Sequence, residues 1–133
     1  CQYFFAKRQT MAQHEIHIVE LHIHFQQQMR EIQKVFPPSV NDPSWIPQSN
    51  DEKRAVRMYW YLVFDEWVTC KYLSKERRLN ALWDRYRYGV ISALSKPAFD
   101  SEVRDMFARN AIFFGLAKEF MLEIEECSQA VKP

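Results

Sequence analysis

The chain has 133 residues, of which 47% are hydrophobic and 15% aromatic, and its net charge is +1. A domain of this length buries a substantial core, so folding requires neither disulfide bonds nor a structural metal. The balanced charge argues against a nucleic-acid partner, and two glycines are too few for the tight turns of an all-β fold.

The first predicted helix covers residues 5–36. Its apolar side chains recur at helical spacing, whereas a strand would turn every second side chain to the opposite face. Residues 15–25, EIHIVELHIHF, alternate apolar and polar letters but belong to the same helix. The apolar stripe, which includes one histidine, consists of Met11, His14, Ile18, Leu21, Phe25, Met29, Ile32 and Phe36.

A proline-rich loop is predicted over residues 37–50, because its prolines stop the helix and impose an extended path. The second helix is predicted over residues 51–72, with Asn50 or Asp51 as its N-cap. This helix is apolar on nearly all sides, so we expect it to be the most buried one.

Two further helices complete the predicted fold. One helix covers residues 75–95, with Ser74 as its N-cap. The other covers residues 101–127, with Asp100 or Ser101 as its N-cap. The short connections between the last three helices favour antiparallel neighbours. The sequence therefore predicts an all-α fold, a four-helix, bundle-like domain with a long first helix.

Residues 1–10 are predicted to be a membrane-proximal segment in front of one helical domain over residues 11–133. Three aromatic residues precede two basic ones, as expected where a transmembrane helix leaves the bilayer on its cytoplasmic side. A preceding span, an acylated Cys1 and an ordinary amphipathic terminus are the alternatives. The boundary residues are Tyr3, Phe4, Phe5, Lys7 and Arg8.

The chain itself has no run of about 20 apolar residues that would cross a bilayer. Its cysteines are odd in number and lack CxxC spacing, which favours a reducing compartment over a disulfide framework or a zinc site. We therefore expect the domain to lie on the cytoplasmic face of a membrane.

The first helix carries a second apolar face. Ile16, Val19 and Ile23 lie opposite the stripe that includes Ile18 and Phe25. A bundle covers only one face of a peripheral helix, and an exposed apolar patch of this kind is uncommon in a monomer. We expect these three residues to bind a partner protein, a second copy or a lipid surface, with burial by the proline-rich loop as the alternative.

The histidines on this helix suggest a metal-binding site. His17, Glu20 and His24 follow one flank at i, i+3 and i+7 and are the candidate ligands. The HExxH and ExxH patterns of zinc proteases and di-iron proteins are absent. We expect no cofactor, and solvated side chains are the favoured interpretation.

Glu66 lies in the centre of the buried stripe predicted for the second helix. A buried carboxylate must be paired, hydrogen-bonded or protonated, and such groups also mark active sites. Tyrosine hydroxyls, Arg87 or His14 are the expected partners, and Asn110 on the fourth helix is expected to join the same polar network.

The sequence provides no clear nucleophile, no second placed carboxylate and no phosphate-binding loop, so no reaction follows from it. We expect a non-enzymatic interaction or assembly subunit that is associated with a membrane through its N-terminal end. The alternative is a sensory or ligand-binding bundle with a pocket near Glu66.

Overall fold

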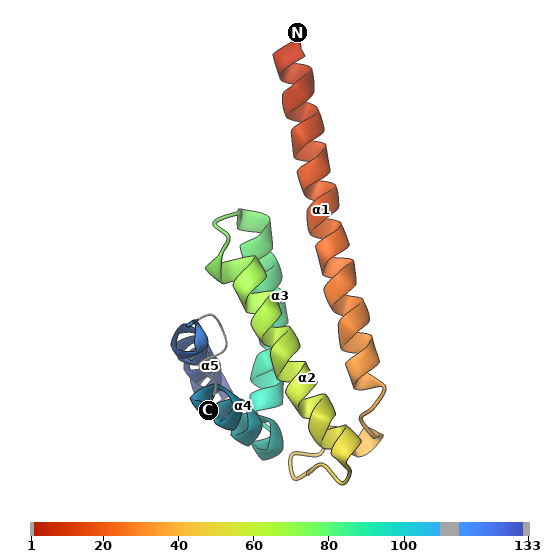
Figure 1. The fold of residues 1–133 in the computed structure, drawn as a ribbon, viewed down its shortest axis with the longest axis vertical. Coiled ribbons are helices and arrows are strands. Elements are labelled where there is room, and N and C mark those ends of the chain that lie inside the picture. The colour runs from red at the N-terminus through yellow and green to blue at the C-terminus, as the bar shows by residue number, and fades with distance from the viewer. Residues whose placement is uncertain (1, 110–114, 132–133) are drawn as a thin grey trace.

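The structure is a computed structural model that describes the backbone of residues 2–109 and 115–131 and the side chains of residues 15–108 and 115–131. These parts of the chain are helical and contain no strand, so the all-α prediction is confirmed. Figure 1 shows α1 on one side of the α2–α3 pair and α4 and α5 on the other. The helices are α1 Gln2–Gln33, α2 Asn50–Trp67, α3 Arg77–Leu94, α4 Pro97–Arg109 and α5 Ala117–Val131.

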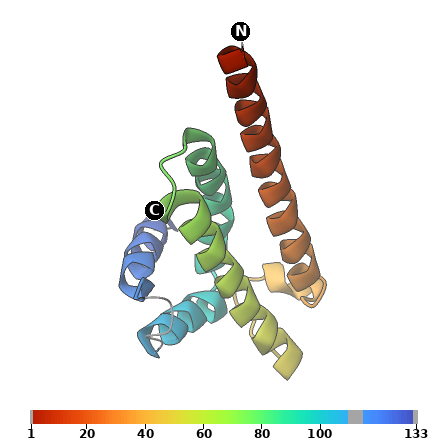
Figure 2. The same ribbon diagram turned by 45° about the horizontal axis from the view of Figure 1, so that its top comes forward.

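α1 has no proline or glycine over its 32 residues, so nothing in the sequence interrupts it. Its C-terminal half lies beside α2 and α3, while its N-terminal half extends past them (Figures 1 and 2). Ile18 and Phe25 are buried, as the periodicity predicts, and the Phe25 ring lies 6.2 Å from that of Tyr86 on α3. The helix ends at Gln33, three residues before the predicted end.

The proline-rich loop forms the base of the structure. It contains a short 3₁₀ helix, η1 Pro38–Asn41, and it buries the indole of Trp45. The Trp45 ring lies 5.7 Å from that of Phe36 and 6.0 Å from that of Phe99. These aromatic contacts hold the end of α1 against the start of α4.

The N-cap of α2 is Ser49 and not Asn50 or Asp51. Its Oγ accepts a hydrogen bond from the backbone N–H of Glu52 (3.1 Å), while the Glu52 carboxylate accepts one from the N–H of Gln48 (2.9 Å). These two bonds satisfy the N–H of Glu52, which the first turn of the helix leaves free, and the N–H of Gln48, the residue before the cap. α2 is the most buried helix, as predicted.

α2 continues into one π-helical turn, η2 Val68–Tyr72. The N–H of Leu73 donates to the carbonyl of Val68 (2.9 Å), a bond between residues five apart. A π turn shifts the following side chains around the axis, and such turns are frequent at functional sites.

α3 begins at Arg77, two residues later than predicted. Glu76, not Ser74, is the N-cap, since its carboxylate accepts from the N–H groups of Arg78 (3.0 Å) and Leu79 (3.1 Å). The Ser74 hydroxyl accepts from the N–H of Glu76 and so supports the turn before the helix (3.0 Å).

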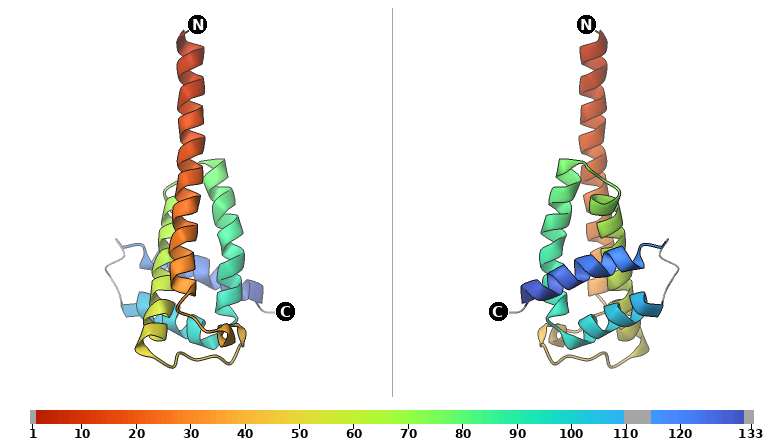
Figure 3. Two further views of the ribbon diagram at one scale, coloured as in Figure 1. Left: turned by 90° about the vertical axis from the view of Figure 1, so that its right-hand side faces the viewer. Right: turned by 90° about the vertical axis from the view of Figure 1, so that its left-hand side faces the viewer.

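The predicted helix over residues 101–127 is two helices in the structure. α4 starts at Pro97, a residue that suits a first helical turn because its missing N–H has no partner there. Gly115 has φ 74°, which a right-handed helix cannot contain. Figure 3 shows α4 and α5 lying across α2 and α3 instead of alongside them.

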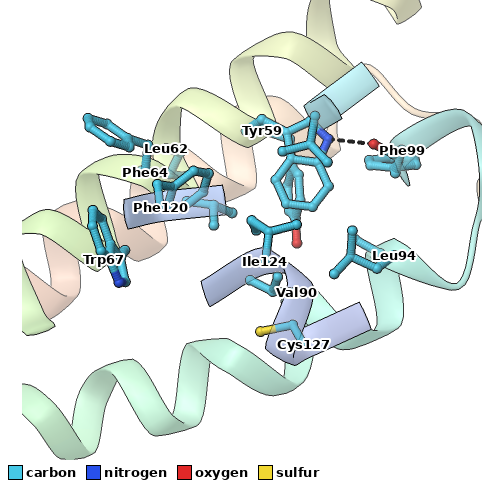
Figure 4. Close-up of a cluster of buried hydrophobic side chains, with 14 of the residues drawn as sticks. Tyr59, Leu62, Phe64, Trp67, Val90, Leu94, Phe99, Phe120, Ile124 and Cys127 are labelled. Atoms are coloured by element: carbon cyan, nitrogen blue, oxygen red, sulfur yellow. Dashed lines mark hydrogen bonds between the residues drawn. The ribbon is translucent and has the colours of Figure 1, made fainter. Parts of the chain in front are cut away.

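The core is aromatic and lies between α2, α3, α4 and α5 (Figure 4). The indole of Trp60 is fully buried, and its Nε1 donates to the carbonyl of Phe99 (2.9 Å), the bond drawn in the figure. The Phe64 and Phe120 rings meet edge to face at 5.3 Å. These contacts join the central pair of helices to the crossing pair.

Candidate functional site

A pocket of about 660 Å³ lies between α1, the residues around η1, α2 and α3. Its volume is in the range of sites for small organic molecules. Aromatic rings, methionine and valine side chains form much of its lining, and Glu66 is the acidic residue in it. The lining includes Met29 from α1, Tyr59 and Val63 from α2, Tyr86 and Val90 from α3, and Phe99 from α4.

Glu66 is buried, as predicted, with 3% of its surface exposed. Among the described residues, none donates a hydrogen bond or forms an ion pair with its carboxylate, which lines the pocket. Burial raises the pKa of Glu66 to about 8, and the negative charge of Asp65 adds to the shift.

The partners predicted for Glu66 bind elsewhere. The Tyr59 hydroxyl donates to the carbonyl of Gly89 (3.3 Å), and Arg87 pairs with Glu123 (3.5 Å), because the crossing of α5 over α3 brings that carboxylate closer. The side chain of His14 and the whole of Asn110 lie outside the described residues.

Glu123 on α5 is a second buried carboxylate that the sequence analysis did not identify. It is 6% exposed, and it accepts from Trp83 Nε1 (2.8 Å) and Lys71 Nζ (3.2 Å) in addition to facing Arg87. Its position three residues after Phe120 indicates the buried face, although the surrounding acidic residues resemble a solvated tail. Because Trp83, Lys71 and Arg87 all contact its carboxylate, Glu123 has a structural role.

His22 and Tyr86 connect α1 to α3 beside the pocket. His22 Nδ1 lies 2.6 Å from the Tyr86 hydroxyl, and the two rings stack with their centroids 5.8 Å apart. Burial raises the pKa of Tyr86, and the charge of Glu66 raises it further. His22 comes four residues after the buried Ile18, which is the signal that places it on the inner face of α1.

Ile16, Val19 and Ile23 form an exposed stripe on α1, which we call the outer stripe. Their exposed fractions are 56%, 56% and 49%, against 8% for Ile18 on the opposite face. The proline-rich loop lies at the other end of the helix and leaves the outer stripe uncovered (Figure 1). Three β-branched side chains are therefore exposed to solvent within two turns of α1.

The metal hypothesis gains no support from the structure. His17, Glu20 and His24 are all exposed, and within the described parts of the chain no group of three potential ligands is close enough to hold a metal ion. The reason is geometric, because seven residues of helix separate His17 from His24 by about 10 Å along the axis.

The membrane-boundary residues Tyr3, Phe4, Phe5, Lys7 and Arg8 lie on the helical backbone of α1, at the end farthest from the core, and their side chains lie outside the described residues. Across the described parts of the chain, no helix is both long and apolar enough to cross a membrane.

Two features of the described residues are thus candidates for binding, the pocket around Glu66 and the outer stripe of α1. They lie on different sides of α1, so each can be tested by substitutions that leave the other intact. Comparisons with protein-family models, with curated proteins and with solved structures found no match.

Proposed function

We propose that this protein is a non-enzymatic assembly module in which the outer stripe of α1 pairs with the same stripe of a second copy. The observation that carries the proposal is the exposure of Ile16, Val19 and Ile23 on a helix whose other face is already buried. Removing apolar surface from water favours association, and the part that exceeds the entropy lost on pairing stabilises the complex. Pairing of two such stripes provides that burial.

The spacing of the stripe supports a helical partner. Steps of three and then four residues match positions a and d of a coiled coil, and isoleucine at position a suits helix pairing. Beyond Ile23 the same face becomes polar at Gln27 and Arg30. A parallel arrangement in register is therefore favoured, because it places each apolar residue against its own copy.

Charge at the edges of the stripe opposes this arrangement and weakens the pair. Glu15 and Glu20 flank the stripe on its two sides, and in a parallel pair they approach each other across the interface. Glu15 is already bridged to Arg78 of α3 (2.6 Å), which offsets the repulsion. The short seam limits the buried area, so we expect a reversible dimer with a dissociation constant of about micromolar order.

A parallel pair would bring two N-terminal ends to one side. We propose that these ends meet the cytoplasmic face of a membrane, with Tyr3, Phe4 and Phe5 in the interface and Lys7 and Arg8 against anionic headgroups. The N-terminal half of α1 extends past the other helices, so this contact would keep the core away from the lipid (Figure 3).

Oxidative cross-linking tests the pairing directly. Val19→Cys, made with Cys1→Ser, should form a disulfide-linked dimer under mild oxidation, because the Cβ atoms at position d of a parallel pair lie close together. Cys70 and Cys127 are buried free thiols. Leu122→Cys in the same background is the control, since Leu122 is an exposed apolar residue on α5. Equal cross-linking rates for the two variants would contradict the proposal.

A further inference from the structure

We infer that the pocket around Glu66 binds a small organic amine that carries one positive charge and an apolar or aromatic body. The ammonium group would pair with the Glu66 carboxylate, and the body would lie among the rings of Tyr59, Tyr86 and Phe99. This site is separate from the outer stripe and goes beyond the assembly function proposed above.

The carboxylate is the first argument. Glu66 and Glu123 are almost equally buried, but Glu123 has three donors around it and Glu66 has none among the described residues. No fully buried side-chain oxygen among the described residues lacks a hydrogen-bond partner, so the Glu66 oxygens open into the pocket, where a bound ligand can reach them. Since Glu66 lines a pocket of about 660 Å³, a ligand has both the space and a group to bind.

The aromatic lining is the second argument. Rings from four different parts of the chain line the pocket, namely Phe36, Tyr59, Tyr86 and Phe99. Aromatic faces attract cations electrostatically, by about 0.5–2 kcal/mol for each contact, and they also cover apolar surface. Rings combined with one carboxylate favour an ammonium group attached to an apolar body over a sugar or a phosphate.

The basic residues in the lining restrict the number of positive charges. Lys96 follows the end of α3, almost three helical turns after Tyr86, and its Nζ lies 5.4 Å from the centroid of the Phe99 ring. Arg85 also lines the pocket and is exposed. A second ammonium group on the ligand would approach one of these cations, so we expect a monoamine and not a polyamine.

The test compares 4-phenylbutylamine with 4-phenylbutanol, 4-phenylbutyrate and spermidine by isothermal titration calorimetry at pH 9, above the Glu66 pKa of about 8, so that the carboxylate is ionised in the free protein. We expect the amine to bind the unaltered protein at least about tenfold more tightly than the alcohol, which is 1.4 kcal/mol. Glu66→Gln should remove that preference while leaving alcohol binding within about threefold. Glu119→Gln, at an exposed carboxylate on α5, should change neither.

A second variant fills part of the pocket and keeps the Glu66 carboxylate. Gly89 lines the pocket on α3, and a Cβ at this position meets nothing within 4 Å, so Gly89→Leu should fold and should weaken amine binding. Equal affinity for the amine and the alcohol, retention of the preference in Glu66→Gln, or stronger binding of 4-phenylbutyrate or spermidine than of the amine would each overturn the inference. Loss of dimerisation would not affect it, because the outer stripe faces away from the pocket.

Discussion

The indole Nε1 of Trp83 donates a hydrogen bond to Oε1 of Glu123 across 2.8 Å and so joins α3 to α5 inside the core. Lys71 and Arg87 neutralise the same carboxylate. Glu66 on α2 is buried to a similar degree, but its side chain faces a pocket. The core therefore holds one carboxylate that stabilises the fold and one that is available to a ligand.

Glu123→Ala is expected to destabilise the protein by about 2–3 kcal/mol, because the buried Trp83 Nε1 loses its acceptor. The loss stays moderate since Lys71 and Arg87 are partly exposed and can turn to water. Urea denaturation measures the change. Glu119→Ala on the same helix should cost less than about 0.5 kcal/mol, and a similar effect of both substitutions would contradict the structural role of Glu123.

Glu66 should make stability depend on pH. Its pKa in the folded protein, about 8, lies above the ordinary value of 4.5, so the folded state binds the proton more tightly than the unfolded state. Its contribution is fully present below pH 4.5 and is lost as the pH rises through 8. Glu66→Gln should therefore unfold with nearly the wild-type free energy at pH 5.

At pH 9 the same variant should be more stable than the wild-type protein by roughly 2–5 kcal/mol, because the wild-type chain must then bury an ionised carboxylate. Urea denaturation of both proteins at pH 5, 7 and 9 measures the difference. A constant difference over this range would show that Glu66 has an ordinary pKa.

Gly89→Ala is expected to stabilise the protein by about 0.5–1 kcal/mol. Gly89 lies inside α3, where glycine is less favourable than alanine, and an added Cβ meets no atom within 4 Å. Thermal unfolding measures the gain. Gly115→Ala should have the opposite effect, since φ 74° strains any residue with a Cβ, and a gain at both positions would contradict the assigned backbone geometry.

Phe4→Asp combined with Phe5→Asp should reduce membrane binding at least about tenfold, because each phenylalanine that enters the interface contributes about 1.5–3 kcal/mol. Co-flotation with phosphatidylcholine vesicles, with and without phosphatidylserine, measures the binding. Gln27→Asp on the same helix is the control. Unchanged flotation of the double variant would remove the membrane contact from the proposed function.

Periodicity was sufficient to predict the features that depend on one helix alone. The two apolar faces of α1, the loop after it and the burial of Glu66 all follow from residue spacing within a single element. The helix N-caps were less predictable. Ser49 and Asn50 can both cap α2, and Ser74 and Glu76 can both cap α3. Which residue becomes the cap depends on the conformation of the preceding loop.

The division into α4 and α5 was not predictable from periodicity. Apolar residues continue at helical spacing from Val103 to Ile124, whereas the positive φ of Gly115 is a feature of the described backbone that one continuous helix could not contain. The site depends on the same long-range arrangement. The crossing of α5 over α3 directs Arg87 to Glu123, and Glu66 is thereby left facing the pocket.

The most direct test of the assembly proposal is the solution mass of the chain, measured by size-exclusion chromatography with light scattering over a range of concentrations. We expect a mass that rises toward twice 16.0 kDa, and a monomer for Ile23→Asp with unchanged helical content. Leu122→Asp, at an apolar residue that is 61% exposed on α5, should behave as the wild-type chain. A wild-type chain that stays monomeric at all concentrations, or an Ile23→Asp variant that still dimerises, would contradict pairing through the outer stripe.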